Sequence, residues 1–272
     1  MQITKWKQYK ILMEDPELRV YLPVTKRFSE CTLWEMVKEY KVVMIKPSRG
    51  RLGFNIYQVS QLNEVEDLYE VHHEGSIIKF AGKDETYSFI KSKIKPNRYI
   101  VQQKIHLIRA EQRLIDFRVM VQRRRNSPDW YVTGKFARLG LLRYIVTNAA
   151  KDILTVEDAM QKTSLNSGQI RKAIKVMDEI ALSAIPHLTA IRPESRVIGF
   201  DFGVDEDGKV WIIEANFKPM VFPFKMLEDD SMYKTIESFK YGKENDTRRE
   251  NHLPEQNKIY EYVKKQWQAA KN

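Results

Sequence analysis

The chain has 272 residues, of which 43% are hydrophobic, so it can bury a core in one large domain or in two lobes. Its formal net charge of +10 favours anionic partners but does not choose among phosphates, nucleic acid, anionic lipid and acidic substrates. Cys31 is the only cysteine, which excludes an internal disulfide or a thiolate zinc site, and no apolar run suits a signal peptide or a membrane span.

The first half of the chain mixes helical and strand patterns. We expect a soluble cytoplasmic protein in which a helix at residues 5–15 is followed by a proline-containing connector. The further elements predicted in this half are a helix at 29–40, a buried strand at 41–47, a glycine loop at 48–53, a strand at 54–62, strand-like alternation over 67–90 and an apolar strand at 98–108.

The second half begins with two long strands around a loop, at 115–140. The loop carries Arg123–Arg125, which is more typical of a solvated tip than of a nucleic-acid contact. A helix is predicted from Thr155, and a longer amphipathic helix at 168–188 carries the stripe Ile170, Ile174, Met177, Ile180 and Ala181. A strand pair at 196–217 follows, and after about residue 240 the chain is polar until a last helix at 259–272. This order predicts an α+β fold, and the lack of a G-x-G-x-x-G turn after a strand argues against a Rossmann site.

The strand pair reads as a β-hairpin around Asp207–Gly208, a dipeptide that favours a two-residue type I′ turn. That turn would pair Val204 with Trp211 and Asp201 with Glu214. Because side chains alternate along a strand, Asp201, Glu214 and Asn216 would share one face. The core face would then carry Phe200, Phe202, Val204, Trp211 and Ile213.

Two opposed carboxylates repel, so water, a proton, a cationic side chain or a metal must offset their charge. Asp201, Glu214 and Asn216 supply hard oxygen donors, which suit Mg²⁺ or Mn²⁺ beside phosphate oxygens. The alternative is a solvated outer face with Lys209 and Lys218 as partners. Earlier in the chain, Lys46 ends a buried strand and a glycine loop follows it, an arrangement that can bring backbone N–H groups and a point charge to a phosphate chain.

A lysine, a glycine loop and a distant hairpin with two acids and an asparagine together resemble the ATP-grasp superfamily, of the carboxylate–amine ligase type. More closely, the chain resembles the endospore coat-associated YheC/YheD-like family of Bacillus-like bacteria. The segments that carry the likeness run from about residue 5 to 225 and include "VVMIKPSRG", "YIVQQKI", "DFRVMVQ", "VTGKFARLG" and "GFDFGVDEDGKVWIIEANFKP". The resemblance implies two α+β lobes with antiparallel sheets that grip a nucleotide between them.

The domain boundaries follow from this resemblance. They are an ATP-grasp domain at 1–240, with a small lobe of about 30–100 and a large lobe of about 101–240, and a polar extension at 241–272 with a terminal helix.

The resemblance also implies roles for individual residues. Lys46 is similar to the lysine that contacts the ATP phosphates, and Arg138 is similar to an active-site arginine that stabilises charge on the transferring phosphate. The residues implied to bind the nucleotide or the acceptor are Lys5, Lys46, Gly50, Gly53, Gln102, Gln103, Ile105, Asp116, Arg118 and Asn148. The residues implied to hold Mg²⁺ or Mn²⁺ are Asp201, Glu214 and Asn216.

This sequence departs from the family pattern at several positions. Relatives often have glycine at the position of Asn55, a basic residue and a glycine pair after Asn148, and glycine at the position of Met220. The chain also begins close to the ATP-grasp core, so we expect that a partner supplies the amino-terminal substrate lobe typical of ligases, or that the protein only binds nucleotide.

The implied chemistry is formation of an acyl phosphate from ATP and a carboxylate, followed by attack of an amine. ATP and a carboxylate and an amine of unknown identity are the expected ligands, spore-coat proteins are candidate partners, and no membrane partner is expected. The competing hypothesis is a nucleotide-binding structural or interaction protein of the spore coat that does not turn over. A third, binding of nucleic acid through charge, predicts steeply salt-dependent binding to any DNA.

Overall fold

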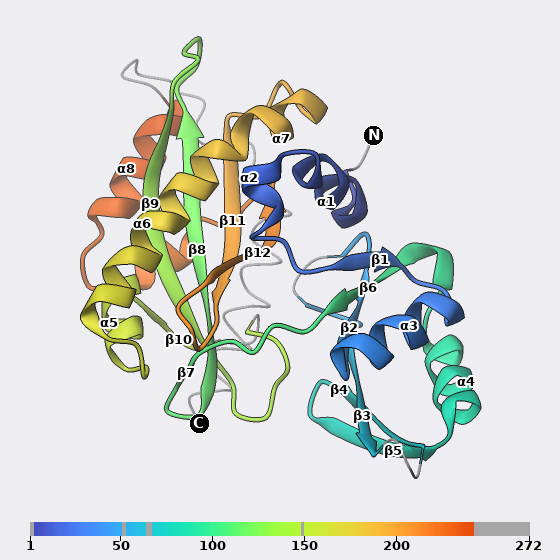
Figure 1. Cartoon of the computed structure of the whole chain (residues 1–272). Coiled ribbons are helices and arrows are strands. Elements are labelled where there is room, and N and C mark those ends of the chain that lie inside the picture. Colours follow the sequence, from blue (N-terminus) through green and yellow to red (C-terminus); the bar gives the residue numbers. More distant parts are fainter. Residues whose placement is uncertain (1–2, 51–52, 64–66, 148–149, 242–272) are drawn as a thin grey trace. The chain divides into compact units, whose positions relative to one another are not determined.

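The computed structural model describes residues 3–50, 53–63, 67–147 and 150–241. The chain divides into two compact units, one formed by residues up to 106 with 143–146, and the other by 107–142 and the residues from 147 on. Each unit contains a sheet whose described strands pair antiparallel, with helices packed on it (Figure 1). The α+β class predicted from the sequence is therefore confirmed. Residues 242–272, including the predicted terminal helix, lie outside the described residues.

The first unit is built on a six-stranded sheet with a mixed strand order. Across the sheet the strands are β1 (Thr25–Arg27), β6 (Tyr99–Gln103), β2 (Val42–Pro47), β3 (Tyr57–Asn63), β4 (Leu68–His73) and β5 (Ser76–Ala81). One face carries the apolar core, in which Ile45, Val59 and Val101 are fully buried. The opposite face is polar, because the alternate positions hold residues such as Gln58 and Gln102.

The first unit also contains helices. They are α1 (Lys5–Met13), α2 (Pro16–Arg19), α3 (Glu30–Tyr40) and α4 (Lys83–Lys93), with a short 3₁₀ helix η1 (Pro96–Arg98) before β6. Helix α3 begins at a capping box formed by Ser29 and Thr32. The strand-like alternation predicted over 67–90 is wrong for its last part, since α4 starts directly after Gly82. Thr86 and Ile90 are four residues apart and both buried, which is a helical spacing.

The second unit contains a sheet whose central strands are long. The strands are, in order, β10 (Ala150–Leu154), β9 (Trp130–Gly140), β8 (Arg113–Arg123), β11 (Val197–Val204) and β12 (Val210–Asn216), and β7 (Arg109–Ala110) pairs with β8. The helices are α5 (Val156–Gln161), α6 (Ser167–Ser183), α7 (Ile185–Ile191) and α8 (Ser231–Tyr241), with a 3₁₀ helix η2 (Phe222–Met226). None of the helices in the described part of the chain is both long and apolar enough to cross a lipid bilayer.

The two faces of this sheet have different coverings. On one face Lys135 of β9 bonds Asp178 of α6, and the predicted stripe of that helix is largely buried, with Met177 and Ile180 at its centre. On the other face η2 and α8 cover one end, where Phe136 contacts Phe224. The remaining part of that second face carries charged side chains that are described below.

The hairpin of β11 and β12 confirms one predicted pair and corrects the rest. Asp201 pairs with Glu214, but Val204 pairs with Val210 rather than with Trp211. The turn is wider than a two-residue type I′ turn, because the side chain of Asp205 accepts bonds from the backbone of Asp207 and Lys209. A β-bulge lies between the pairs Asp201–Glu214 and Phe202–Ile212, where β12 has one extra residue. The bulge compensates for the longer turn, so the pairing at Asp201 has the expected register.

The bulge also changes which residues of β12 reach the core. Trp211 and Ile213 were predicted as core residues and are only partly buried. Trp211 pairs with Gly203, which lies on the face of Asp201, and its indole N–H donates to Asp205 at 2.7 Å. Ile212 takes the core position opposite Phe202 instead, and Phe200, Phe202 and Val204 are fully buried as predicted.

Gly134 in β9 gives a direct test of the packing between this sheet and its covering helices. A Cβ atom at Gly134 would lie 2.6 Å from a ring carbon of Phe224 and 3.1 Å from the terminal carbon of Ile236. We expect Gly134→Ala to lower the free energy of unfolding by about 1–3 kcal/mol, because η2 and α8 must move outward. Urea-induced unfolding measures this change.

The matched control is Gly75→Ala, since a Cβ atom there has no heavy atom within 4 Å. That variant should stay within about 0.5 kcal/mol of the parent protein. Equal losses in the two variants would contradict the packing described for Gly134.

Candidate functional site

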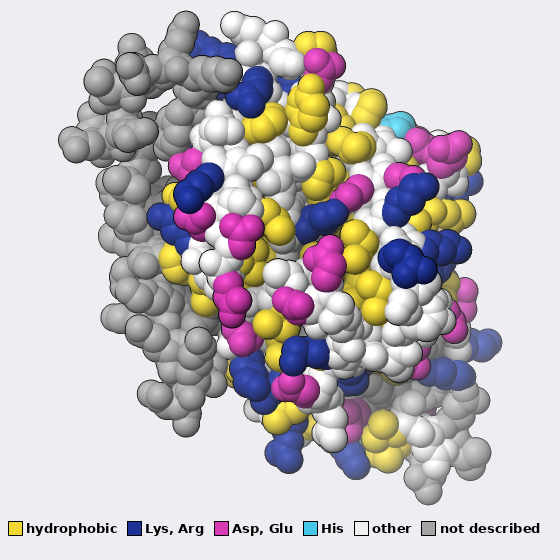
Figure 2. Space-filling model, turned by 90° about the vertical axis from the view of Figure 1, so that its left-hand side faces the viewer, with side chains coloured by type: hydrophobic (Ala, Val, Ile, Leu, Met, Phe, Trp, Pro, Cys, Tyr) yellow, Lys and Arg dark blue, Asp and Glu magenta, His cyan; other side chains and the backbone are white. Residues whose placement is uncertain are grey.

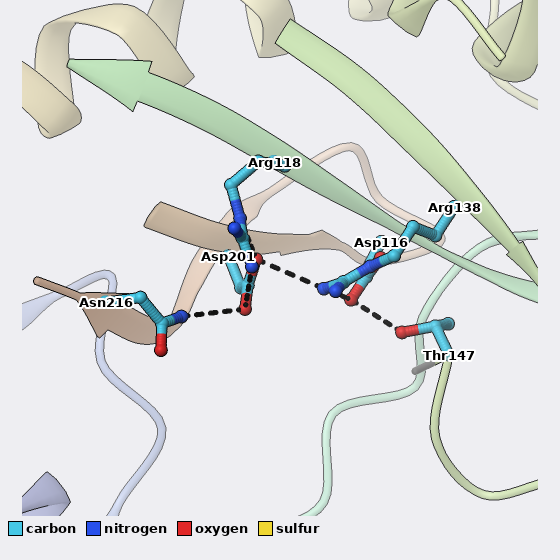
Figure 3. A network of polar contacts seen from close by, with 6 residues as sticks. All are labelled: Asp116, Arg118, Arg138, Thr147, Asp201 and Asn216. Carbon is cyan, nitrogen blue, oxygen red and sulfur yellow. Dashed lines mark hydrogen bonds and ion pairs between the residues drawn. The ribbon is translucent and has the colours of Figure 1, made fainter. Parts of the chain in front are cut away.

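A network of charged side chains lies on the sheet of the second unit (Figure 3). Arg138 lies two residues after Phe136 in β9, so it projects to the face on which Phe136 contacts Phe224 of η2. Arg138 of β9 donates to both carboxylate oxygens of Asp116 of β8, with N···O distances of 2.7 and 2.5 Å. The hydroxyl of Thr147 donates to the same carboxylate at 2.5 Å. Asp116 is thus held by a bidentate ion pair and a hydroxyl, which is among the stronger arrangements for a carboxylate.

Asp201 of β11 occupies the centre of the network. Arg118 donates its Nε to one carboxylate oxygen at 2.6 Å and its Nη2 to the other at 3.0 Å. Arg138 reaches the first oxygen at 3.1 Å, and the side-chain amide of Asn216 donates to the second at 3.2 Å. Each oxygen of Asp201 therefore accepts two contacts.

The network is buried and electrically balanced. The side chains of the two arginines and two aspartates are all 9% exposed or less. Two positive and two negative charges offset one another, as burial of charge in a protein requires.

The acid–base properties of the network follow from this pairing. Burial alone would raise the pKa of Asp201, but the charges and hydrogen bonds of Arg118 and Arg138 outweigh it, so this pKa lies below its ordinary value. Burial alone would lower the pKa of Arg138, but Asp116 and Asp201 outweigh it and raise this pKa above its ordinary value. Asp201 and Arg138 are therefore charged at neutral pH.

Strand register assembles these side chains from distant parts of the chain. Asp116 is paired with Arg138 across β8 and β9, and Asp201 is paired with Arg118 across β11 and β8. Directly paired residues project to the same face, about 4.5–5.5 Å apart at Cβ. Gly199 leaves room for Arg118, because a Cβ atom there would lie 3.2 Å from the Cδ of Arg118 and 2.6 Å from Pro219.

The residues predicted to bind a metal carry the kind of ligand atoms that a divalent ion such as Mg²⁺ prefers. Asp201, Glu214 and Asn216 lie on one face and offer hard oxygen donors. Glu214 is partly buried beside Asp201. The carboxylate of Asp201, however, is already engaged by two arginines, and the amide oxygen of Asn216 points away from it (Figure 3). A cationic side chain, one of the alternatives that the sequence left open, thus offsets the charge of Asp201 in this structure.

The polar face of the first unit carries a second set of predicted residues. The amine of Lys46 donates to the side-chain oxygen of Gln102 at 2.6 Å, and the amide nitrogen of Gln102 donates to Thr25 at 2.9 Å. Lys104 donates to Gln58 at 2.6 Å on the same face. Lys46 and Gln102, which the resemblance implies bind different parts of the nucleotide, thus contact each other.

The other predicted residues of the first unit have separate positions. The amine of Lys5 donates to the backbone oxygen of Gly50 at 3.3 Å, so the start of α1 lies against the glycine loop. Gln103 faces away from Gln102 and accepts a bond from the backbone of Val24 at 3.3 Å. Ile105 is partly buried just after β6.

Two further positions complete the predicted set. Gly53 has a φ of 69°, which is the left-handed conformation that glycine favours. Asn148 lies outside the described residues.

Sequence reasoning missed three residues of these two clusters. Thr147 bonds Asp116, and Lys104 and Gln58 bond each other. Thr147 and Lys104 are sequence neighbours of predicted residues, and Lys104 also lies within the segment "YIVQQKI" that carries the family likeness. Gln58 had none, because its place beside Lys104 depends on the strand order β6-β2-β3.

Comparison with known proteins identifies relatives for most of the chain. The sequence model of a family described as YheC/D-like ATP-grasp matches residues 2–243. Over 225 residues the chain is 30% identical to the endospore coat-associated protein YheD of Bacillus subtilis strain 168, covering 79% of this chain and 48% of YheD. It is 20% identical over 223 residues to YheC of the same organism, covering 79% of this chain and 59% of YheC. The chain thus spans about half the length of these relatives.

A solved structure has a similar fold. The C-terminal domain of K. lactis Pby1, an ATP-grasp enzyme that interacts with the mRNA decapping enzyme Dcp2, aligns with a TM-score of 0.50 and 16% identity. The alignment covers 87% of this chain and 70% of that one. The two antiparallel sheets with their helices are the ATP-grasp fold, as the sequence predicted.

The Arg118–Asp201 pair should behave as a coupled unit in stability measurements. We expect Arg118→Met and Asp201→Asn each to lower the free energy of unfolding by about 3–5 kcal/mol, because each leaves a buried charge without its partner. The double variant should lose clearly less than the sum of the two single losses. Urea-induced unfolding of the four proteins at pH 7 gives the coupling energy.

The coupling should also depend on pH with a defined sign. The pKa of Asp201 is lowered on folding, so its stabilisation is fully present above the ordinary pKa of a carboxylate and is lost as the pH falls through the lower folded value. The difference in stability between the parent protein and Asp201→Asn should therefore shrink in strong acid. Additive losses at pH 7 would contradict the coupling.

Proposed function

The chain belongs to the YheC/D-like ATP-grasp family, and on this basis we propose that it binds ATP with Mg²⁺ or Mn²⁺ and acts as a carboxylate–amine ligase. The observation that carries the proposal is the pairing of Asp201 with Glu214, with Asn216 on the same face. Two carboxylates and an amide at this spacing suit a divalent ion that also binds phosphate oxygens. Spore-coat association is proposed by analogy with the names of the two relatives.

On the first unit, Lys46 supplies a positive charge for the phosphates. Its amine is held in place by Gln102, which is itself held by Thr25, so the charge is positioned before a ligand arrives. Lys5, bonded to Gly50, adds a second charge next to the glycine loop. Positioned cations of this kind bind phosphate without having to reorganise first. Ile105, which follows β6, is assigned to the adenine.

On the second unit, Glu214, Asn216 and Asp201 would hold the divalent ion, which would neutralise charge on the phosphates. Arg118 and Arg138 are the cations of this unit next to that position. Asp116 and Thr147 orient Arg138. We assign Arg138 to the charge that develops on the transferring phosphate.

The proposed reaction has two balanced steps. A carboxylate oxygen of the acceptor attacks the γ-phosphorus of ATP, the bond to the bridging oxygen breaks, and ADP leaves. An amine then attacks the acyl carbon, phosphate leaves with the bonding electrons, and the amine loses a proton. The protein contributes by positioning the reactants, stabilising charge and excluding water from the acyl phosphate.

One observation favours a second candidate, a nucleotide-binding structural protein of the spore coat without turnover. Both arginines of the network are paired with aspartates, and Arg138 contacts two carboxylates at once. An arginine held in this way is a stable part of the fold, so its presence alone does not require a reaction. Turnover therefore has to be measured separately from binding.

The charges on one described face of the molecule do not favour nucleic acid as a partner for that face. Figure 2 shows one face of the molecule, on which lysine and arginine side chains alternate with aspartate and glutamate. Several of the charges on the second unit are paired, including Lys175 with Glu179 and Lys234 with Asp230. Binding to a phosphate backbone calls for a patch of one sign.

Glu214→Gln tests the proposed metal site. We expect this variant to lose Mg²⁺-dependent ATP binding in isothermal titration while its circular dichroism spectrum shows an intact fold, because the amide keeps the shape of the side chain but not its charge. The matched control is Glu206→Gln, which makes the same substitution at an exposed position of the same hairpin. Unchanged ATP affinity in Glu214→Gln would reject the metal assignment.

Turnover is tested with ATP, Mg²⁺ and pools of amino acids, acidic peptides and sugar acids. We expect ADP and a product whose mass equals that of a carboxylate plus an amine less water, and we expect neither from Lys46→Met. Mass spectrometry with an ADP assay detects both. ATP binding with no ADP from any pool would favour the structural candidate over the ligase.

A further inference from the structure

We propose that Arg118 makes this site selective for a metal–nucleotide complex, by blocking Asp201 until a divalent cation and a phosphate chain arrive together. The inference rests on the proposed function, since it concerns the same site. It assigns to Arg118 a role that differs from that of Arg138. Arg118 is a selectivity residue, and the cation and the phosphate are its two competing partners.

The first step of the argument is that Asp201 cannot take a metal as it stands. Both of its carboxylate oxygens accept two contacts, from Arg118, Arg138 and Asn216. A cation that bound this carboxylate would have to displace at least one donor. It would also bring further positive charge close to two buried guanidinium groups, which repel it.

The second step identifies the donor that leaves. Arg138 is anchored by Asp116 through two hydrogen bonds, so it keeps a full partner without Asp201. Within the described part of the chain, Arg118 has hydrogen bonds only to Asp201. The side chain of Arg118 lies over Gly199, a residue that has no side chain of its own, with Pro219 packed beside it. Arg118 is therefore the group that can be released.

The third step is the balance of charge. A cation alone would take Asp201 and leave Arg118 buried without an acceptor, which is unfavourable because a buried charge needs a partner. A phosphate chain alone would take Arg118 and leave its own negative charge next to Asp201. When both bind, the cation pairs with the carboxylate and the guanidinium pairs with phosphate, for which its planar fork is well suited. Only the joint ligand gives each charged group of the network a partner of opposite sign.

This reasoning gives opposite expectations for two variants. Arg118→Met frees Asp201 and should bind Mn²⁺ without nucleotide at least about tenfold more tightly than the parent protein does. Asp201→Asn frees Arg118 and should bind ATP in the presence of EDTA at least about tenfold more tightly than the parent protein does. Mn²⁺ is followed by the electron paramagnetic resonance signal of the free ion, and ATP by isothermal titration.

Two controls separate this effect from general loosening of the fold. The double variant Arg118→Met/Asp201→Asn lacks both groups and should show neither gain. Arg171→Met removes an exposed arginine from α6 and should behave as the parent protein. Gains in the double variant equal to those in the single variants would overturn the proposal.

A measurement on the parent protein keeps the test independent of variant stability. In protein labelled with ¹⁵N-arginine, the Nε–H resonance of Arg118 reports its bond to Asp201. We expect little change with Mg²⁺ alone or with ATP in EDTA, and a large shift with both. A shift with either one alone that equals the shift with both would overturn the proposal.

The outcome also distinguishes this inference from the proposed function. If the parent protein binds no ATP even with Mg²⁺, the proposed function fails. If it binds ATP and the cation independently of each other, only the selectivity of Arg118 fails. Gains in the two single variants together with joint binding in the parent protein support both.

Discussion

The candidate site depends on one constraint, which is that the two arginines and two aspartates in the sheet of the second unit must remain balanced in charge. Arg118, Arg138, Asp116 and Asp201 are nearly inaccessible to solvent, so none of them can rely on water to stabilise its charge. The register of three strands supplies the partners instead. A ligand that displaces one member of an ion pair must offer the other member a new partner of opposite charge. This requirement limits which ligands can bind.

The sequence predicted the elements and some of the pairing, and the errors have physical causes. Alternation along 196–217 predicted that Asp201 lies opposite Glu214, and the structure has that pair. The prediction succeeded although its turn was wrong, because the wider turn at Asp205 and the bulge near Asp201 offset each other. Alternation of side chains alone cannot reveal a bulge. Trp211 and Ile213 lie between the turn and the regular pairing at Glu214, so the prediction assigned them to the core face in error. Helix α4 was missed because a helix and a strand of mixed polarity look alike over short windows.

The sequence predicted many of the residues of the candidate site, but it predicted fewer of the contacts between their side chains. Lys46 and Gln102 meet because β2 and β6 are neighbours, and the sequence identified both residues. It could not tell that Gln103 lies on the opposite face, which follows from alternation only once the start of the strand is known. The bond between Arg118 and Asp201 spans 83 residues and requires β8 to lie beside β11. Strand order of this kind is a property of the whole sheet, so residue patterns within one segment do not contain it.

The two arginines illustrate how placement refines a role assigned from motif likeness. Both were assigned to phosphate or acceptor chemistry from the sequence. Among the described residues, Arg138 contacts two carboxylates, whereas Arg118 contacts one. Replacing buried ion pairs by apolar residues of similar size is often neutral or stabilising, so stability alone is weak grounds for a network of this kind. In the described structure Arg138 is anchored by two aspartates, whereas Arg118 has Asp201 alone as its hydrogen-bond partner. This difference is accounted for by a function in which both arginines are positioned in advance and Arg118 exchanges Asp201 for a ligand.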